Sequence, residues 1–575
     1  MKRIILTALV IVLFINQLQL SAQKLFTPED ASYNNPALYA KGLSNLQWLP
    51  NTTQFTYVSN NCLVKGTPES ESRDTILKLN KLNDAFVQQG LKASKNFPAI
   101  KWVDEARFTV TKSNKIFLYD IINHGIKLLN AYPDDATNTD VAPITNFVAY
   151  TRDNNLFVSF DGSEQAVSNE TNTGILYGSE RVHRNEFGIE KGTFWSPNGK
   201  LLAFYRMDET MVTNYPLVDI TTRIAELKNT RYPMAGMTSH QVTIGVYNTE
   251  NKTITYLNTG LPADQYLTTV TWDPKSEHIY AAVLNRDQNH LKFNKYYAKT
   301  GKLVRTLFEE HNERYVEPEN DPEFLPNDDS KFIWLSERDG YKHMYLYDTT
   351  GKLLGQLTKG NWMVNKIIGF NPKLGLAYFN ATKDSPLQSN AYSIDIKKQT
   401  IKRLTPEHGT HTAMISTNGN YIIDSYSSSD IAKRIVVYDA KNKLVQELLK
   451  NTNPLSDYNV PATKVFSIKN SEGTDLYCRL IRPVDFDSTK KYPVIVYVYG
   501  GPHAQLITDT WLWGAGIYLN YLAQQGYLVF TLDNRGSANR GFEFESIIHR
   551  NCGIKEVEDQ MAGVQYINKL PYFEI

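Results

Sequence analysis

The 575-residue chain has little cysteine, no excess of charge of either sign and no Gly-x-Ser-x-Gly motif. Cys62, Cys478 and Cys552 are far apart, odd in number and outside any metal-ligand spacing, so we expect structural thiols without a disulfide framework. The formal net charge of +1 gives no electrostatic reason to expect nucleic acid as a partner. We therefore expect no metal, no organic cofactor and no nucleic-acid partner.

Long apolar runs are also missing after the first 22 residues. At the start, Lys2 and Arg3 precede the apolar run Ile4–Ile15, and small residues close the segment at Ala22. The run is shorter than the roughly 20 residues that a membrane span needs, which disfavours the alternative of a membrane anchor. We predict a signal peptide over 1–22 and an exported protein without a membrane span, in the periplasm, at the cell surface or outside the cell.

What the sequence does contain, from 40 to 450, is a repeat. An aromatic or apolar residue leads into a Pro/Asn/Gly turn, and short alternating strands follow. Eight copies are anchored at Trp48, Trp102, Ile144, Trp195, Trp272, Leu325, Phe370 and Ile415. Most anchors are 42 to 54 residues apart, and such a period with several strands per unit is typical of a β-propeller. We predict an eight-bladed propeller, with an interface or functional insertion at about 212–241, where one step is 77 residues long.

After a polar linker at 451–461 the pattern changes. Lys464–Ile468 and Leu476–Ile481 read as an antiparallel strand pair, and Val494–Tyr499 follows as a strand that is apolar at every position. Strands of this kind are buried on both faces in parallel sheets, and open α/β sheets bind ligands at the carboxyl ends of their strands. We predict the start of an α/β-hydrolase domain over 462–575.

Two further elements complete this prediction. Gly526–Asp533 reads as a second buried strand. Lys555–Leu570 reads as a helix, because its apolar residues recur with helical spacing on one face. The residues of that face are Val557, Met561, Val564 and Ile567.

Three motifs in this order resemble the prolyl oligopeptidase family of serine peptidases, in its dipeptidyl peptidase IV branch. They are Tyr-Pro-Val-Ile-Val-Tyr-Val-Tyr-Gly-Gly-Pro at 492–502, Asp-Asn-Arg-Gly-Ser-Ala-Asn-Arg-Gly at 533–541 and Glu-Val-Glu-Asp-Gln at 556–560. With the signal peptide and the propeller, the resemblance covers nearly the whole mature chain. It implies a propeller that filters access to a peptidase active site.

The segment around Glu186 refines the resemblance. Dipeptidyl peptidases of this branch carry two adjacent glutamates that hold the substrate's amino terminus, whereas Glu186 here has Asn185 beside it. A single glutamate followed by Phe-Gly-Ile-Glu-Lys-Gly-Thr-Phe-Trp-Ser-Pro is similar to the bacterial prolyl tripeptidyl aminopeptidases. The resemblance implies that Glu186 binds the substrate's ammonium by a charge-assisted hydrogen bond. The alternative is a solvated loop carboxylate, and we read the neighbours His183 and Arg184 as surface loop residues.

Tyr499 matches the tyrosine whose hydroxyl helps to form the family's oxyanion hole. A phenol aimed at the developing alkoxide stabilises the tetrahedral intermediate. The alternative is a tyrosine that packs at a strand end. By strand alternation, Tyr497 is expected on the opposite face, in the core.

Other polar residues receive weaker roles. Arg107 and Lys112 lie where the branch places an arginine for the substrate carbonyl, but neither is in a matching motif, so this role stays open. We expect Asp533 and Arg535 to structure a loop, through an Asp–Arg pair, and not to supply the triad acid. Asp559 lies on a predicted helix and does not fit the triad either.

The absence of the nucleophile elbow limits the catalytic prediction. The resemblance places the nucleophile, acid and base beyond Ile575, so we expect a fragment or a truncated product with an incomplete peptidase domain. One hypothesis is that the full-length product is a secreted, homodimeric serine exopeptidase that releases N-terminal tripeptides by cutting after proline. The other hypothesis is a catalytically inactive propeller protein that at most binds peptides. A dipeptidyl or acyl-aminoacyl peptidase is a third option.

Overall fold

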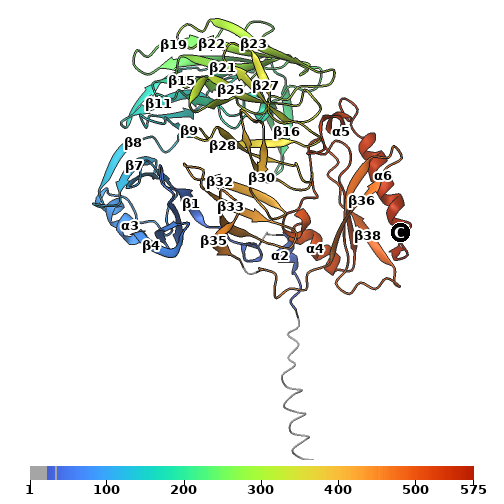
Figure 1. Cartoon of the computed structure of the whole chain (residues 1–575). Helices are drawn as coiled ribbons and strands as arrows, with labels where there is room; N and C mark the ends of the chain where they lie inside the picture. Colours follow the sequence, from blue (N-terminus) through green and yellow to red (C-terminus); the bar gives the residue numbers. More distant parts are fainter. Residues whose placement is uncertain (1–22, 33–34, 452, 575) are drawn as a thin grey trace, which may run out of the picture.

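The computed structural model describes residues 23–32, 35–451 and 453–574, so the predicted signal peptide lies outside the described residues. Eight antiparallel sheets of four or five strands follow one another along the chain and form the blades of a propeller (Figure 1). A further five-stranded sheet with helices lies to one side of it, in the orange and red part of Figure 1. The predicted eight-bladed propeller followed by an α/β-hydrolase start is confirmed.

Each blade is built from one continuous stretch of chain. Blades one to four comprise β1 (Ser44–Trp48), β2 (Phe55–Ser59), β3 (Cys62–Thr67), β4 (Ser70–Lys78); β5 (Ile100–Trp102), β6 (Arg107–Lys112), β7 (Lys115–Asp120), β8 (Ile126–Ala131); β9 (Thr137–Val141), β10 (Val148–Arg152), β11 (Asn155–Phe160), β12 (Ser163–Ala166); and β13 (Ile175–Tyr177), β14 (Thr193–Trp195), β15 (Leu201–Asp208), β18 (Gln241–Asn248), β19 (Ile254–Tyr256). Helix α3 (Leu79–Gln88) lies between the first two blades.

Blades five to eight are regular four-stranded sheets. They comprise β20 (Tyr266–Trp272), β21 (His278–Leu284), β22 (His290–Tyr297), β23 (Leu303–His311); β24 (Glu323–Leu325), β25 (Asp328–Ser336), β26 (His343–Asp348), β27 (Leu353–Gln356); β28 (Val364–Asn371), β29 (Leu376–Ala381), β30 (Asn390–Asp395), β31 (Ile401–Arg403); and β32 (Thr410–Ile415), β33 (Tyr421–Ser427), β34 (Arg434–Asp439), β35 (Leu444–Lys450). The insertion predicted in blade four is a separate hairpin of β16 (Asn214–Asp219) and β17 (Glu226–Arg231).

The four tryptophan anchors of the repeat each connect their own blade to the preceding one. Four indole N–H groups donate hydrogen bonds of 2.9 to 3.0 Å across blade boundaries: Trp48 to the carbonyl of Met414, Trp102 to the hydroxyl of Thr56, Trp195 to the carbonyl of Asp140 and Trp272 to the carbonyl of Phe194. The first of these joins blade one to blade eight. The ring is therefore closed by side-chain contacts, since no blade shares strands from both ends of the chain.

The α/β sheet has the strand order β36-β37-β39-β38-β40. Its strands are β36 (Thr463–Lys469), β37 (Asp475–Ile481), β38 (Tyr492–Val496), β39 (Leu528–Leu532) and β40 (Phe573–Glu574), and its helices are η3 (Trp511–Gly514), α4 (Ile517–Gln524), α5 (Phe542–Ser546) and α6 (Lys555–Ile567). The antiparallel pair β36–β37 and the fully buried β39, which runs parallel to β38, are as predicted.

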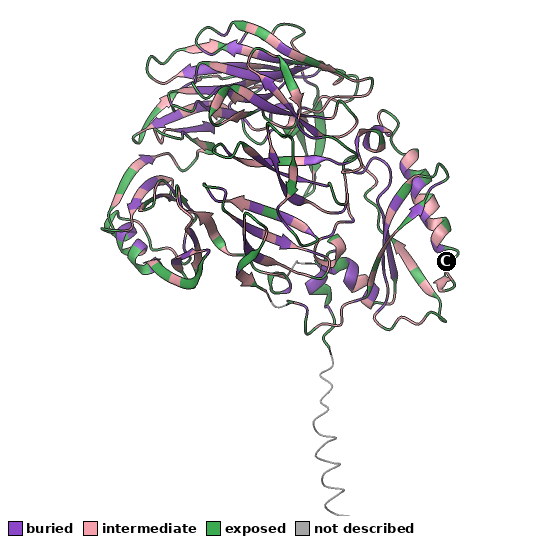
Figure 2. Cartoon of the chain, in the orientation of Figure 1, coloured by how far each residue is buried: buried purple, intermediate pink, exposed green. Residues whose placement is uncertain are grey.

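The prediction for the strand at Val494–Tyr499 is wrong in length and burial. Strand β38 ends at Val496, and beyond it Tyr497 and Tyr499 are 42% and 64% exposed, so Tyr497 is not a core residue. The physical reason is that β39 covers one edge of β38, whereas among the described residues its other edge pairs only with the two-residue β40. Figure 2 shows the resulting pink and green edge beside the purple β39.

Helix α6 packs with a face that only partly agrees with the predicted one, since Ile567 is buried and Val564 half-buried. Val557 and Met561 are exposed, and the buried positions are Glu556, Asp559, Gly563 and Ile567. Gly563 lies so close to β39 that a Cβ there would be 2.9 Å from the Leu532 side chain. This close approach and the buried carboxylate of Asp559 determine the rotation of the helix, which apolar spacing alone does not reveal.

The first described residues pack on the α/β part and not on the propeller. Phe26 lies in an apolar cluster with Leu38, Leu455 and Ile517. Helix α2 (Pro28–Ser32) contacts α4, and η1 (Pro36–Leu38) follows it. The sequence assigns residues 23–39 to no domain, and the structure adds residues of this segment to the α/β part.

Candidate functional site

Glu186 lies on a turn of unusual backbone conformation, between β13 and β14 of blade four. The three preceding residues, His183, Arg184 and Asn185, have φ values of 51°, 61° and 64°, and Phe187 has 59°. Side chains other than glycine cost about 1–3 kcal/mol each in such conformations, which persist only where the surroundings impose them. Glu186 itself is extended and exposed. The surroundings therefore fix the backbone of the turn, while the side chain of Glu186 is exposed to solvent.

His183 is not the predicted surface residue, because its side chain is buried beneath the turn. Its Nε2 accepts a hydrogen bond of 3.0 Å from the backbone N–H of Leu267 in β20, and its Nδ1 lies 3.0 Å from Nε2 of His240. Burial lowers the pKa of His183 well below its usual value and that of His240 to about 4. Both imidazoles are therefore neutral at physiological pH.

Arg184 is also more buried than predicted. Its guanidinium forms an ion pair of 3.2 Å with Glu209, whose side chain is almost fully buried, and it lies over the ring of Tyr232. It also donates to the backbone carbonyl of Arg231 at the end of β17. The sequence does not predict the roles of Glu209, Tyr232 and His240. These residues lie 25 to 57 positions along the chain from the turn residues that they contact, and no local sequence pattern links them to the turn.

The turn borders a cavity of about 340 Å³ that Phe187–Lys191 share with Glu319 and Asp321. Gly188 has φ of +68°, and a Cβ at this position would lie 2.9 Å from the carbonyl oxygen of Glu319. Only glycine allows both this conformation and this approach. The connection between blades five and six therefore forms one wall of the Glu186 site.

Tyr499 lies beyond the end of β38, in a Gly-Gly-Pro loop. Its ring folds over Gly501, where a Cβ would be 2.7 Å from Tyr499 Cε1. The backbone N–H of His503 donates to the carbonyl of Gly536 at 2.8 Å, which attaches this loop to the one that follows β39. The phenol remains 64% exposed and available to a bound molecule.

The two parts of the site share the connection between β23 and β24. His503 Nε2 lies 3.2 Å from Glu317, and Nδ1 lies 3.7 Å from Glu545 of α5. The hydrogen bond to Glu317 raises the pKa of His503 to about 9. Two residues further along the same connection, Glu319 touches Gly188 of the Glu186 turn. The predicted binding residue and the predicted oxyanion donor are thus attached to one segment.

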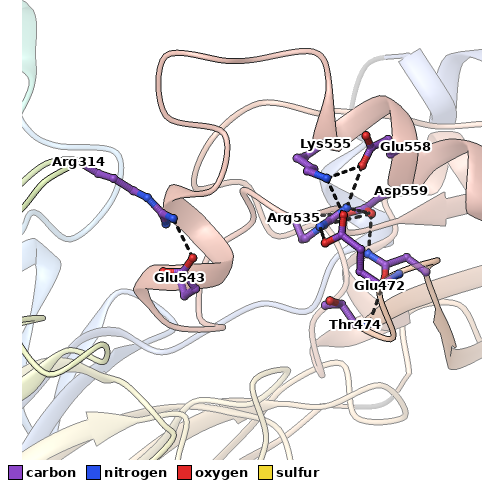
Figure 3. A network of polar contacts seen from close by, with 9 residues as sticks. Arg314, Glu472, Thr474, Arg535, Glu543, Lys555, Glu558 and Asp559 are labelled. Carbon is purple, nitrogen blue, oxygen red and sulfur yellow. Dashed lines mark hydrogen bonds and ion pairs between the residues drawn. The ribbon is translucent and has the colours of Figure 1, made fainter.

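Asp533 structures its loop as predicted, but not by pairing with Arg535. The carboxylate accepts backbone N–H bonds from Leu506 and Ile507 at 2.9 and 3.1 Å. Arg535 instead pairs with the buried carboxylate of Asp559, with the closest contacts at 2.8 and 2.9 Å (Figure 3). Two further carboxylates pair with this guanidinium, that of Glu558 on α6 and that of Glu472 in the turn between β36 and β37.

Other groups that could have contributed are already engaged. Arg107 pairs with Asp104 in its own turn, and Lys112 donates to Ser94 at 2.7 Å. The carboxylate and imidazole of Asp273 and His278 lie together, but Asp273 accepts two backbone N–H bonds of that turn, so this contact is explained as a cap. No helix among residues 23–574, gaps apart, is long and apolar enough to cross a membrane.

The comparisons with known proteins agree with this fold. The model of the dipeptidyl peptidase IV N-terminal region matches residues 94–433, and that of the prolyl oligopeptidase family matches 514–574. A Bacteroides ovatus crystal structure described as a dipeptidyl aminopeptidase IV is 41% identical with a TM-score of 0.90, over 96% of this chain and 80% of that one. The structure of Porphyromonas gingivalis dipeptidyl peptidase 4 is 25% identical with a TM-score of 0.80, over the same shares.

Curated relatives extend the comparison to fungi. Dipeptidyl peptidase 4 of Trichophyton rubrum is 25% identical over 92% of this chain and 71% of its own length. The chain spans about half the length of the fungal dipeptidyl-aminopeptidases B that it matches. With a family model over more than half of its residues, and with the propeller and α/β sheet in the order described above, the chain belongs to the dipeptidyl peptidase IV branch of the prolyl oligopeptidase family.

Proposed function

We propose that the whole protein is a serine exopeptidase that removes tripeptides from peptides with a free amino terminus, by cutting after proline. This chain supplies Glu186 to bind the substrate's ammonium and Tyr499 to donate to the oxyanion. The observation that carries the proposal is the exposed carboxylate of Glu186, which has no hydrogen bond or ion pair with another residue in the described part of the chain. It is held out on a strained turn beside a cavity.

The chemistry follows from the groups present. An ammonium that reaches the Glu186 carboxylate gains a charge-assisted hydrogen bond of about 1.5–3 kcal/mol, which corresponds to about 10- to 150-fold in affinity. Asn185 is neutral, and its side chain donates to the carbonyl of Glu180 at 2.9 Å, so it adds no second charge. A single carboxylate is compatible with a product one residue longer than that of dipeptidyl peptidases.

The binding step can be tested on the 575-residue chain itself. Calorimetry would compare a hexapeptide that begins Ala-Ala-Pro with its N-acetylated twin. We expect the free amine to bind at least about tenfold more tightly. Glu186→Gln should abolish that preference, and Glu71→Gln, which changes an exposed glutamate in β4 of blade one, should leave it unchanged. Equal affinity for the two peptides in the unaltered chain would contradict the role of Glu186.

The length of the product needs the catalytically complete protein. We expect faster release of p-nitroaniline from Ala-Ala-Pro-pNA than from Gly-Pro-pNA. The relatives reported above are named for dipeptide release, so the opposite order would replace tripeptidyl by dipeptidyl specificity.

A second candidate function is peptide binding without catalysis. It would need only the exposed carboxylate of Glu186 and the cavity beside it. Reading the gene past the codon for Ile575 separates the two candidates. An open frame with a Gly-x-Ser-x-Gly motif supports the peptidase, and a stop codon supports the binding protein.

Two further expectations accompany the proposal. We propose export, for which the residues at 1–22 provide the sequence signal. We also propose a homodimer, because the β16–β17 hairpin exposes several large apolar side chains. They are Leu217, Val218, Ile220, Ile224 and Leu227. Sedimentation of the chain with Ile220 and Ile224 changed to Asp would test this, with loss of the dimer as the expected result.

A further inference from the structure

We propose that His183, His240 and Arg184 are positioning residues that hold Glu186 toward the amino terminus of a bound peptide. The inference rests on the proposed role of Glu186 and deepens it, because it assigns the groups that create the geometry of the site. None of the three residues needs to touch the peptide.

The need for such groups comes from the backbone. Three consecutive residues before Glu186, and Phe187 after it, have left-handed conformations, and none of them is glycine. Asparagine and histidine tolerate this conformation better than most residues, but arginine and phenylalanine gain nothing from it. A segment of this composition adopts the turn only where contacts from outside it impose the shape.

The first set of contacts is a pair of buried imidazoles. Because His183 Nε2 accepts from the N–H of Leu267, its proton lies on Nδ1 and is donated to Nε2 of His240. His240 therefore carries its own proton on Nδ1, for which the described residues offer no acceptor. One tautomer of each ring is thus selected, and this chain of two hydrogen bonds fixes His183 against blade five.

The second set of contacts surrounds the guanidinium of Arg184. It pairs with Glu209 at 3.2 Å, lies 5.5 Å from the centre of the Tyr232 ring and donates to the carbonyl of Arg231. Arg231 in turn donates to three backbone carbonyls between the end of β15 and the start of β16. They are those of Glu209, Thr210 and Val212. Arg184 thereby joins the turn to the base of the β16–β17 hairpin.

Glu186 lies between a fixed start and a fixed end. The start is held by the two sets of contacts just described. At the other end, the Phe187 ring lies 5.1 Å from that of Tyr266, and Gly188 touches Glu319. The backbone of Glu186 is therefore set before a ligand arrives, while its carboxylate remains unpaired. Such preorganisation reduces the ordering that binding would otherwise require.

The experiment measures the ratio of affinities for the hexapeptide Ala-Ala-Pro-Ala-Ala-Ala and its N-acetylated twin, on the full 575-residue chain. His240→Leu removes the acceptor for His183, and we expect the ratio to fall at least about fivefold toward one. His240→Gln places an acceptor near the position of Nε2, and the ratio should stay within about twofold of the original. Arg184→Met should lower the ratio as His240→Leu does.

A matched control separates positioning from general damage. His411 is buried in blade eight, where it pairs with Asp424, so His411→Leu disturbs the core at least as strongly and far along the ring from Glu186. We expect this variant to lose thermal stability and to keep the affinity ratio. Melting temperatures of all variants identify those that are folded.

The outcomes are distinct for the two proposals. A ratio of one in the unaltered chain would remove the role of Glu186, and the inference with it. A clear preference for the free amine that both His240→Leu and Arg184→Met leave intact would overturn the inference alone. If His240→Leu does not fold, the other two variants decide. The inference is contradicted if His240→Gln loses the preference for the free amine, or if Arg184→Met keeps it.

Discussion

At the scale of single residues, burial separates ion pairs that matter for stability from those that do not. Arg535 and Asp559 are almost completely buried, and their contact joins the loop after β39 to helix α6. Arg550 and Asp287 form a pair of 3.2 Å, but both side chains are about 70% exposed. Removing one partner of a buried pair leaves an uncompensated charge, whereas exposed pairs contribute little.

We therefore predict that Arg535→Met lowers the free energy of unfolding of the α/β part by about 3–5 kcal/mol. Hydrogen exchange of the amides in β39 would measure this loss. The control, Arg550→Met, removes the same charge and should change protection by less than about 1 kcal/mol. Equal effects of the two substitutions would mean that the buried pair has no special role.

A second prediction at this scale concerns Tyr499 in the catalytically complete protein. Tyr499→Phe removes the phenol but retains the ring that covers Gly501. Loss of one oxyanion donor should lower kcat by about 10²- to 10³-fold, with little change in KM. Tyr497→Phe, two residues earlier and also exposed, serves as the control, and an equal loss there would point to loop structure instead of catalysis.

At the scale of elements, the tryptophan anchors give the repeat its physical meaning. Each anchoring indole donates a hydrogen bond to the preceding blade. A tryptophan that recurs in the sequence repeat therefore forms a contact between neighbouring blades. Of the four anchoring indoles, Trp102 is the one that donates to a side chain. Its acceptor, the hydroxyl of Thr56, belongs to a residue with no exposed surface.

We predict that Trp102→Phe destabilises the first two blades by about 1–3 kcal/mol beyond the loss of contact area, since it leaves the Thr56 hydroxyl without its donor. Trp511→Phe is the matched control, because the buried indole nitrogen of Trp511 has no acceptor among the described residues. Thermal unfolding would compare the two variants. A larger loss for Trp511→Phe would show that ring packing, and not the hydrogen bond, governs these positions.

Elements with a periodic signal could be predicted, and those fixed by distant contacts could not. The blade strands and β39 follow from spacing and apolar runs. The exposed end of β38 depends on which strand lies beside it, and the rotation of α6 depends on Gly563 and Asp559. Likewise, Glu186 could be assigned from its motif, whereas the turn that holds it depends on His240 and Glu209, which no local pattern connects to it.

At the scale of the whole molecule, the contact between propeller and α/β part contains several groups that hold protons more firmly than usual. The hydrogen bond to Glu317 raises the pKa of His503 to about 9. Burial raises the pKa of Glu545 to about 8 and that of Glu337 to about 7. Lys342, which pairs with Glu319, lies among these groups and keeps its charge.

These shifts predict a decrease in stability of this contact as the pH rises from about 4.5, the ordinary pKa of glutamate, to about 9, the raised pKa of His503. For each group the pKa is higher in the folded protein, so its contribution is complete below the ordinary pKa and is lost as the pH passes the raised one. Melting temperatures across this range would record the decrease. In the His503→Gln variant, the melting temperature should no longer fall above pH 8. An unchanged slope in this variant would show that His503 does not cause the effect.

The chain enters and leaves the propeller at neighbouring points, which determines how the propeller can be removed or replaced. The segment before the propeller and the segment after it lie together, since Lys24 pairs with Tyr458 in a short bridge and Asn451 donates to the carbonyl of Lys41 at 2.8 Å. The propeller is therefore a cassette inserted into a loop of the α/β part. Joining residues 40 and 453 directly would excise it, and a ring with another number of blades could be exchanged for it without rerouting the rest of the fold.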